Sequence, residues 1–558
     1  MCGIAGICDL NGKNVSRPLI TMLKSIEHRG PDGVGAIVGK SLVKSDSLDD
    51  ERLRDLKGSI GLGHVRLAIV GGLGFNQPLQ DCRAEIFVVH NGEVYNYREL
   101  KKTLEKRHRF VTKTDSEVIS HLIEEYYTGD LSQAVSKAIQ HIDGVYTLAV
   151  FDGDSVVIAR DRLGVRQLYF GSNESVVAFA SEKKALWKIG LSKIKRVPPG
   201  VVATIDKAGV RIADRQKPPF KRPEVNIMKQ AFGNYVGALR EAVLKRIRGV
   251  KKVGIIFSGG IDSILVAQLA RNLGSDVTCY AVGMQGSDDV EYARRSAEEL
   301  GFKYRVKTLS GTDVEEILPE VIAAIEDRSF LQVEVSIPIF EAVKMAHEDG
   351  CRVVLTGQAA DELFAGYPWY RTIADKEGYD ELNKRMLDDI LKLYKETLER
   401  EDKIAMWHSV EMRVPYLDLE VVSAATGINP RLKLPLNDDL GKRVHRDVAL
   451  LVGVPEKYAM RPKEAAQHGS GIHDAIIKIA LKNGFSEKLA LKTDYSAEDS
   501  IEEKLGSSQR YGYKYDEENI WGTPDYVQMY LDYTAFRNGV VDSHFNEQLE
   551  HQLSALVK

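Results

Sequence analysis

Four compact apolar runs between residues 253 and 357 constrain the fold more than any other feature of the sequence. The runs read VGIIF, VTCYAVG, KYRVKTL and RVVLTG, and an amphipathic segment of helical length separates each run from the next. Alternating strands and helices predict a parallel, doubly wound α/β sheet with helices on both faces. Ligands bind such sheets beyond the carboxyl ends of the strands, so we expect chemistry in the residues that follow these runs.

The part of the chain before about residue 210 has a different pattern. Short β-rich runs such as AEIFVVHNGEVYN and GVYTLAVFDGDSVVIARD are broken by Gly, Asn and Asp turns, which predicts an α+β domain built on antiparallel sheets between helices. The proline-rich stretch QKPPFKRPEVN indicates a linker. We therefore expect a first domain over 2–212, a linker over 213–228, a second domain over 229–484 and a mostly helical extension over 485–558.

Composition excludes several classes of function. The 558 residues are 44% hydrophobic and 28% charged, enough for two large cores, and a net charge of -4 gives no basic field for nucleic acid. The sequence shows no secretory signal and no run long enough to span a bilayer. Its five cysteines lack the paired spacing of a zinc site and the density of a disulfide scaffold. We expect a cytoplasmic protein with reduced thiols that binds neither nucleic acid nor membrane.

Cys2 directly follows the initiator methionine, and a small residue at this position permits removal of that methionine. Removal would give Cys2 both a thiol and a free α-amine, whose pKa of roughly 7.7 to 8.0 suits it to accept the thiol proton. Nucleophile and base would then belong to one residue. A lone cysteine at the start of a strand is more often a small hydrophobic residue, so the surrounding motifs decide between the two interpretations.

Five ordered segments of the first 120 residues resemble class II glutamine amidotransferases, which have the N-terminal-nucleophile hydrolase fold. The segments are CGIAG (2–6), HRGPDG (28–33), GHVRLAIV (63–70), NGEVYN (91–96) and TDSEV (114–118). The resemblance implies that Cys2 attacks the side-chain amide of glutamine, while the Asn91 side chain and the Gly92 N–H stabilise the oxyanion. It also implies that Arg66 holds the α-carboxylate of glutamine and that acidic residues hold its α-ammonium. The implied glutamine-binding set is Arg66, Ile69, Val70, Asn91, Glu93 and Asp115.

Those implied roles have simpler alternatives. Arg66 and Asp115 could form a surface ion pair, and NGEVYN could be a turn between two strands. The functional interpretation is favoured because nucleophile, oxyanion donor, carboxylate clamp and ammonium clamp all occur in the order of the family.

The second candidate site begins at SGGIDS (258–263), which follows the buried run VGIIF and precedes a helical segment. A glycine pair between a strand and a helix can turn its N–H groups toward an anion. The motif is neither the Walker loop nor GxGxxG, and a lone SGG could be an ordinary turn. The full motif resembles the pyrophosphate loop of ATP pyrophosphatases, with matching positions at Ser258, Gly259, Gly260, Asp262 and Ser263.

Three further segments resemble glutamine-dependent asparagine synthetases: GQAADELFAGY (357–367), HSVEMRVPYLD (408–418) and RPKEAAQHGSG (461–471). The resemblance implies that Lys463 contacts the phosphates and stabilises the leaving pyrophosphate, and that Val282, Thr356 and Gly357 line the ATP site. Asp262 and Asp361 are the candidate Mg²⁺ ligands. Lys463 could instead be a solvated surface residue, and Asp361 and Glu362 could cap the following helix.

Two departures from the family pattern concern the acceptor. Gln358 stands where many asparagine synthetases have a glutamate with a proton-handling role, and SFLQVEVSIP (329–338) lacks the threonine and arginine pattern of bacterial relatives. They leave open a runner-up hypothesis, in which the same machinery amidates a carboxylate other than aspartate. A non-catalytic regulator that senses glutamine or ATP is a third, less favoured hypothesis, because Cys2, Asn91, SGGIDS and Lys463 are all retained.

The leading hypothesis is asparagine synthesis from aspartate, glutamine and ATP, with Mg²⁺ as the expected metal cofactor. A β-aspartyl adenylate forms with release of pyrophosphate, and ammonia from glutamine displaces AMP. Ammonia should travel inside the protein, because in water near pH 7 it is mostly ammonium, a poor nucleophile. The expected partners are the small molecules glutamine, aspartate or another carboxylate, and ATP. A homodimer is possible, and the sequence does not determine the oligomeric state.

Overall fold

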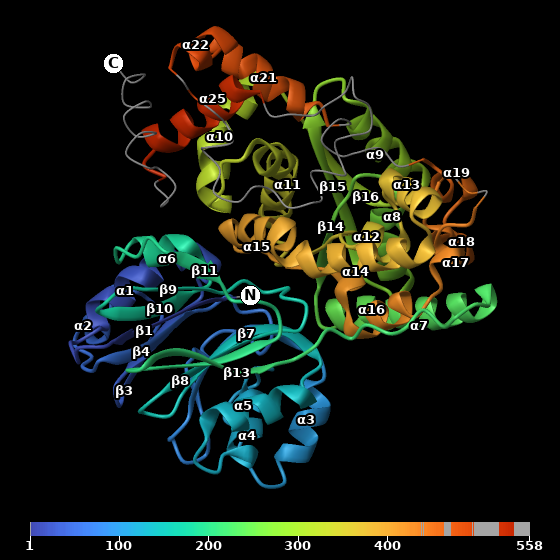
Figure 1. Ribbon diagram of the computed structural model, residues 1–558. Coiled ribbons are helices and arrows are strands. Elements are labelled where there is room, and N and C mark those ends of the chain that lie inside the picture. The colour runs from blue at the N-terminus through green and yellow to red at the C-terminus, as the bar shows by residue number, and fades with distance from the viewer. Residues whose placement is uncertain are drawn as a thin grey trace. The chain divides into compact units, whose positions relative to one another are not determined.

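The computed structural model describes residues 2–436, 438, 440–462, 470–493, 495 and 524–540 (Figure 1). The chain divides into two compact units, which we call the first unit and the second unit. The first unit contains Met1–Pro218 together with Thr397–Glu411, and the second contains Pro219–Glu396 and Met412–Lys558. No helix within the described residues combines the length and the apolar character needed to cross a membrane.

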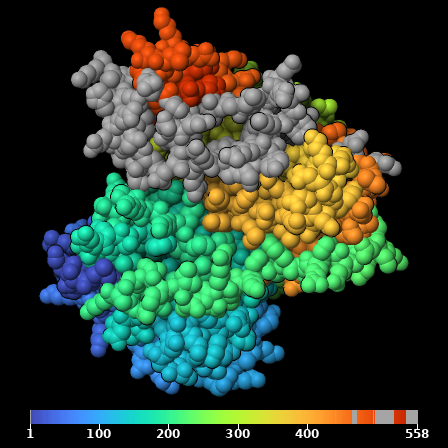
Figure 2. Space-filling model, in the orientation of Figure 1, coloured from blue at the N-terminus to red at the C-terminus, as the bar shows by residue number. Residues whose placement is uncertain are grey.

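The first unit contains two antiparallel sheets. The seven-stranded sheet has the order β11-β9-β10-β1-β4-β2-β3 and the six-stranded sheet has the order β13-β12-β8-β7-β6-β5. The strands are β1 (Gly3–Asp9), β2 (Val34–Val38), β3 (Ser41–Ser45), β4 (Ile60–Val65), β5 (Leu79–Gln80), β6 (Phe87–Val94), β7 (Gly144–Phe151), β8 (Val156–Arg160), β9 (Tyr169–Ser172), β10 (Val176–Ala180), β11 (Ile194–Arg196), β12 (Val201–Asp206) and β13 (Gly209–Arg215). The edge strand β13 lies on the surface, where its green side chains are visible in Figure 2.

Helices cover the outer faces of the two sheets, so the unit has four layers (Figure 1). The helical elements are α1 (Ser16–Ser25), η1 (Glu27–Arg29), α2 (Glu51–Arg54), α3 (Tyr97–Leu104), α4 (Glu117–Tyr126), α5 (Leu131–Ala138), η2 (Ile139–His141) and α6 (Lys183–Trp187). β1 is buried along its whole length. Ile4 and Cys8 pack between the sheets, and Ala5 and Ile7 pack under the helices, because successive side chains of a strand point to opposite faces. A strand with two buried faces is hydrophobic throughout, which explains the run GIAGIC.

The second unit is built on a five-stranded sheet with the order β16-β15-β14-β17-β18. β14 pairs with β15 and β17, and β15 pairs with β16, all in parallel. The strands are β14 (Lys252–Ile256), β15 (Asp276–Met284), β16 (Lys303–Leu309), β17 (Val353–Leu355) and β18 (Glu411–Arg413). The chain leaves β14 toward β15 and β16 and later returns to the other side of β14, so β14 and β17 flank a topological switch point.

Helices form the rest of the second unit, and their amphipathic pattern gives each a buried face. They are α7 (Met228–Ile247), α8 (Ile261–Asn272), α9 (Asp288–Glu299), α10 (Gly311–Ile325), α11 (Phe330–Glu348), α12 (Ala360–Phe364), α13 (Pro368–Lys376), α14 (Tyr379–Glu396), η3 (Pro415–Leu417), α16 (Leu419–Thr426), α17 (Pro430–Lys433), α18 (Arg443–Leu451), α19 (Glu456–Ala459), α21 (Ile472–Lys482), α22 (Glu487–Lys492) and α25 (Asp525–Arg537).

One helix departs from the order of the sequence. α15 (Leu398–Trp407) follows α14 along the chain, yet the segment that contains it clusters with the first unit. Its charged run, residues 399–403, is buried. A run of five charged residues is typical of a solvated helix face, so the burial of this one requires charged partners in the first unit.

Candidate active sites

Cys2 and Asn91 are brought together by the two sheets of the first unit. Cys2 directly precedes β1, and Asn91 lies on β6. The Cys2 N–H donates a hydrogen bond of 3.1 Å to Asn91 Oδ1, and Cys2 Sγ lies 4.0 Å from the carbonyl oxygen of Leu67. Burial raises the pKa of the Cys2 thiol above its ordinary value, although the nearby Arg66 charge opposes this effect. The resting thiol is therefore protonated near neutral pH and needs a base to become a nucleophile.

The amide group of Asn91 is oriented by that hydrogen bond. Since Oδ1 accepts from Cys2, Nδ2 points elsewhere, and it is buried with no hydrogen-bond partner among the described residues. A buried donor without a partner costs about 1–3 kcal/mol, so the position suits a ligand oxygen. Gly92 follows on the same strand, where an added Cβ would lie 2.0 Å from the Val145 carbonyl oxygen. Only glycine permits this close pairing of β6 with β7.

Arg66 directly follows β4 and is 3% exposed. Its Nη2 donates to the carbonyl oxygen of Val70 at 3.2 Å, while its Nη1 is buried and has no hydrogen-bond partner in the part of the chain that the structure describes. Asp115 and Glu93 are also buried, and Asp115 Oδ2 accepts a hydrogen bond of 2.9 Å from the Val94 N–H. The charge of Arg66 lowers the pKa of the Cys2 thiol and the charge of Asp115 raises it, so both side chains lie near the thiol. Ile69, like Val70, is partly buried and lies in the loop that follows Arg66.

Arg29 supports the Cys2 backbone, a role that the sequence did not indicate. Its Nε donates to the Cys2 carbonyl oxygen at 3.1 Å, its Nη1 to Glu182 at 2.7 Å and its Nη2 to Asp402 of α15 at 2.8 Å. Arg166 connects to Glu411, in the same segment as α15, by a second buried ion pair of 2.9 Å. α15 is thus held by the first unit through charged groups, and one of these pairs reaches the backbone of Cys2 directly.

The loop over 257–260 joins β14 to α8 in the second unit. The Gly260 N–H donates to Ser258 Oγ at 3.2 Å, and Ser263 Oγ donates to the Gly260 carbonyl oxygen at 3.0 Å. Gly259 has a φ of +70°, and an added Cβ would lie 2.8 Å from Ser296 Oγ. No described side chain caps α8, so its first N–H groups are available to an anion, which the helix dipole also favours.

Thr356 and Gly357 follow β17 and lie across the switch point from this loop. A Cβ added to Gly357 would lie 2.9 Å from Cβ of Asp262 and 3.0 Å from the Ser263 nitrogen, so the two segments are in contact. Val282 is buried on the neighbouring strand β15. The structure therefore gathers the sequence-predicted ATP-site residues around β14, except Lys463, which lies outside the described residues.

The sequence motifs did not predict a role for Lys442, a buried lysine that lies beside Asp262 and Asp361. Lys442 Nζ lies 2.6 Å from Asp262 Oδ2 and 2.7 Å from Asp361 Oδ1, and His445 Nε2 lies 3.0 Å from Asp262 Oδ1. Burial lowers the pKa of the Lys442 ammonium, but the two carboxylates outweigh burial and hold that pKa above its ordinary value. No motif marks Lys442, because its partner Asp262 lies 180 positions earlier in the chain.

Comparison with known proteins assigns the family. Residues 1–202 match the glutamine amidotransferase domain family, and residues 235–377 and 372–531 match the asparagine synthase family. A Methanocaldococcus jannaschii protein whose name places it with glutamine-hydrolysing asparagine synthetases is 38% identical over 542 residues, which are 88% of this chain and 97% of that protein. The chain belongs to the glutamine-hydrolysing asparagine synthetases.

A further relative of this synthetase is similar over most of its length. Asparagine synthetase 2 of Arabidopsis thaliana, also named as glutamine-hydrolysing, is 30% identical over 457 residues, 79% of this chain and 73% of its own. A solved glutamine phosphoribosylpyrophosphate amidotransferase from B. subtilis is 23% identical, covers 55% of this chain and 65% of its own, and has a TM-score of 0.35. The predicted family and its carbon–nitrogen ligase activity are confirmed. The two predicted fold classes are confirmed by the antiparallel sheets of the first unit and the parallel sheet of the second.

Proposed function

We propose that this synthetase makes asparagine from aspartate, using ammonia released from glutamine at Cys2 and ATP bound around β14. The observation that carries the proposal is the pair formed by Cys2 and Asn91. One residue supplies a thiol and an amide nitrogen, and the other turns its oxygen to that nitrogen and leaves an unpartnered donor in the site.

The pair supports a complete glutaminase step. After methionine removal, the Cys2 nitrogen is an amine that Asn91 Oδ1 holds in place, and it takes the thiol proton. The thiolate attacks the amide carbon of glutamine, and Asn91 Nδ2 and the Gly92 N–H donate to the oxyanion. Such donors stabilise a transition state by about 3 kcal/mol each. The C–N bond breaks, the amine proton returns to the departing ammonia, and water hydrolyses the thioester to glutamate.

Charged groups around the pair would orient glutamine. The free Arg66 Nη1 suits the α-carboxylate, while Glu93 and Asp115 suit the α-ammonium. Val70 fixes the other end of the guanidinium through its carbonyl oxygen, and Ile69 packs against Leu67 in the same loop. An arginine that already has one protein partner loses little side-chain freedom when substrate binds.

ATP chemistry is assigned to the switch point of the second unit. Ser258, Gly259, Gly260 and Ser263 would hold the pyrophosphate part of ATP, and Val282, Thr356 and Gly357 would line the nucleotide. The β-carboxylate of aspartate attacks the α-phosphorus and pyrophosphate leaves, with Lys463 proposed to stabilise its charge. Ammonia then attacks the acyl carbon of the adenylate and AMP leaves.

Mg²⁺ belongs to the proposal as the counter-ion of the ATP phosphates, whose charge it would neutralise. Asp262 and Asp361 are its candidate ligands, and their carboxylates converge as a metal site requires. Both, however, already face the Lys442 ammonium within 2.7 Å. The residues present therefore suit a site that ATP completes with its phosphate oxygens better than a site formed by protein carboxylates alone.

The acceptor segment is helical in the structure. Residues 330–338 belong to α11, where Glu334 Oε2 lies 2.7 Å from His473 Nδ1. Burial raises the pKa of Glu334, and the hydrogen bond to Glu334 raises the pKa of His473. This segment thus places a carboxyl–imidazole pair in the second unit where the family pattern has threonine and arginine, so the acceptor is the part of the proposal to test first.

Pyrophosphate release provides that test. With ATP, Mg²⁺ and glutamine, we expect release that depends on aspartate, and asparagine whose amide nitrogen comes from ¹⁵N-amide glutamine. Parallel reactions contain glutamate or other carboxylic acids in place of aspartate. Pyrophosphate release with one of these acids and none with aspartate would mean that the acceptor is that acid. Both half-reactions of the proposal would remain.

The contact from α15 to Cys2 gives a second expectation. Asp402→Asn removes one carboxylate charge from Arg29, so the Cys2 backbone loses a rigid support, and we expect kcat/KM for glutamine hydrolysis to fall roughly tenfold, mainly through kcat. Glutamate formation measures the effect. Glu399→Gln is the matched control, because Glu399 lies on the same helix and pairs with Arg196 and Lys403 instead of Arg29. Equal losses in both variants would mean that α15 acts only on stability.

A further inference from the structure

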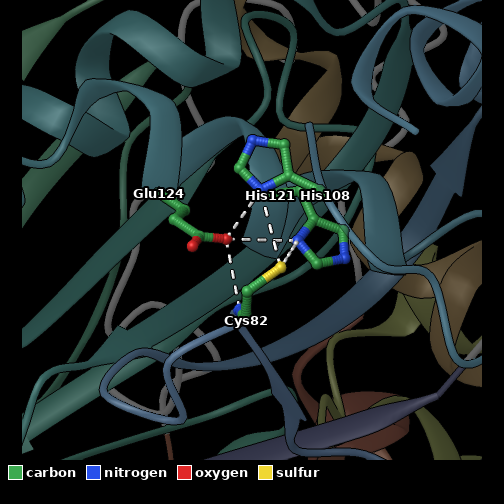
Figure 3. Close-up of side chains that lie close together, drawn as sticks. All are labelled: Cys82, His108, His121 and Glu124. Carbon is green, nitrogen blue, oxygen red and sulfur yellow. Dashed lines mark hydrogen bonds and ion pairs between the residues drawn. The ribbon is translucent and has the colours of Figure 1, made fainter. Parts of the chain in front are cut away.

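Four side chains of metal-ligand type meet on the outer helical layer of the first unit, and none of them is among the residues assigned above. They are Cys82, His108, His121 and Glu124, and one ligand atom from each lies within 4.8 Å of all the others. Cys82 lies in the turn between β5 and β6, His108 follows α3, and the other two are on α4. Figure 3 shows the four side chains pointing toward one another. We call them the Cys82 cluster.

Three distances between ligand atoms of the Cys82 cluster match those of a tetrahedral zinc site, and a fourth is shorter. Bond lengths of about 2.3 Å to sulfur and about 2.0–2.2 Å to nitrogen or oxygen place ligand atoms roughly 3.6 Å apart for S···N and roughly 3.4 Å apart for N···O. Cys82 Sγ lies 3.6 Å from His108 Nδ1 and 3.7 Å from His121 Nδ1. Glu124 Oε2 lies 3.3 Å from His121 Nδ1 and 2.9 Å from His108 Nδ1, so a zinc ion would lengthen only the last of these contacts.

The surroundings of the cluster also suit a metal ion. His108 Nε2, the nitrogen that faces away from the cluster, lies 2.6 Å from Glu125 Oε1, whereas His121 Nε2 lies 3.8 Å from Glu117 Oε1, too far for a hydrogen bond. A carboxylate behind a ligating imidazole fixes its orientation and strengthens it as a ligand. The Arg109 N–H lies 3.4 Å from Cys82 Sγ and donates to it, which stabilises a thiolate.

The cluster is partly closed to solvent. The side chains of His121, His108 and Glu124 are 2%, 8% and 11% exposed, respectively, whereas Cys82 is exposed. The two imidazole rings lie 5.0 Å apart with both Nδ1 atoms toward the thiol. This convergence on one point is what a central ion requires, and the exposed cysteine provides its path of entry.

We propose that the Cys82 cluster binds one structural Zn²⁺ ion. Thiolate, imidazole and carboxylate ligands in a tetrahedron favour zinc over magnesium or calcium, and four protein ligands leave no open position for a substrate. The ion would join the β5–β6 turn, the loop after α3 and α4. Glu117 at the start of α4 also accepts hydrogen bonds of 2.6 Å and 2.7 Å from the N–H groups of Val111 and Thr112, so the same ion steadies the loop that leads to Asp115.

Metal analysis of the full-length protein tests this proposal. The protein is purified without a polyhistidine tag from zinc-supplemented cells, and bound metal is measured by mass spectrometry after gel filtration. We expect about one zinc per chain, removal of zinc by a chelator with a lower thermal midpoint, and recovery of the midpoint when zinc is restored. Uptake of Co²⁺ by the metal-free protein should give the sulfur-to-cobalt charge-transfer and d–d absorption of a tetrahedral site.

Variants identify the ligands. Cys82→Ser should lose the charge-transfer band, and His121→Ala should lose the bound zinc. His141→Ala and Cys8→Ala, which alter the same residue types elsewhere in the first unit, should keep both. Glu125→Gln retains all four ligands, so it is less liable to misfold than the ligand variants. It should weaken zinc binding by about 10- to 100-fold. Protein with neither bound zinc nor a cobalt spectrum would overturn the proposal and leave a hydrogen-bonded cluster, as would unchanged zinc affinity in a folded Cys82→Ser variant.

Discussion

Cys2→Ala should abolish asparagine formation from glutamine and leave formation from added ammonium within about twofold of the wild-type rate. Loss of a covalent nucleophile typically lowers kcat by about 10⁴- to 10⁶-fold. The ammonium-dependent reaction needs only the groups around β14 in the second unit. The fold should tolerate the change, because the contact of Sγ with the Leu67 carbonyl oxygen is long, at 4.0 Å, and removal of Sγ leaves a small cavity that costs about 1 kcal/mol.

Both reactions can be followed by asparagine formation, with glutamine or ammonium chloride as the nitrogen source. Cys8→Ala is the matched control, because Cys8 is a buried cysteine near the far end of β1, the strand that Cys2 precedes, where it pairs with Val177 and Ile60. It should retain both activities. Glutamine-dependent synthesis by a folded Cys2→Ala protein would exclude Cys2 as the nucleophile, and loss of both activities in that protein would contradict two independent sites.

The fold was predictable because its signals are local. The continuous buried run of β1 and the alternation of strands and helices after residue 252 can both be recognised from consecutive residues. Motifs such as SGGIDS also lie in one stretch, and the strand and helix on either side decide where their N–H groups point. The structure adds the switch point, which explains why β14 and β17, and not β15 and β16, carry the densest set of predicted ATP-site residues.

The ionic and metal-binding features could not be predicted in this way, because each joins distant parts of the chain. Arg29 meets Asp402 across 373 positions, and Lys442 meets Asp262 across 180. In the sequence, the charged run of α15 is typical of a solvated face, yet the structure buries it. The Cys82 cluster has only a His-x-x-Glu spacing on α4 as a local signal, since its cysteine and first histidine come from two other segments.

Lys442→Met should abolish ATP-dependent synthesis with either nitrogen source, while glutamine hydrolysis at Cys2 continues. Without the ammonium, Asp262 and Asp361 lose their shared cation beside the pyrophosphate loop, and two carboxylates then repel each other and the incoming triphosphate. We expect aspartate-dependent pyrophosphate release to fall at least about 100-fold. Breaking a buried ion pair by removing one partner costs about 3–5 kcal/mol, so the second unit should also unfold at a lower temperature.

A second buried lysine separates this electrostatic role from simple loss of a buried charge. Burial lowers the pKa of Lys433 to about 7, and its ammonium has no hydrogen bond or ion pair with any residue that the structure describes. Lys433→Met therefore removes a charge that the fold accommodates poorly, and it should keep both pyrophosphate release and thermal stability. If Lys442→Met folds and releases pyrophosphate at the wild-type rate, the Lys442 network stabilises the second unit without positioning the ATP site. A loss confined to Lys442→Met, measured on protein shown by circular dichroism to be folded, would place the ammonium among the groups that organise Asp262 for catalysis.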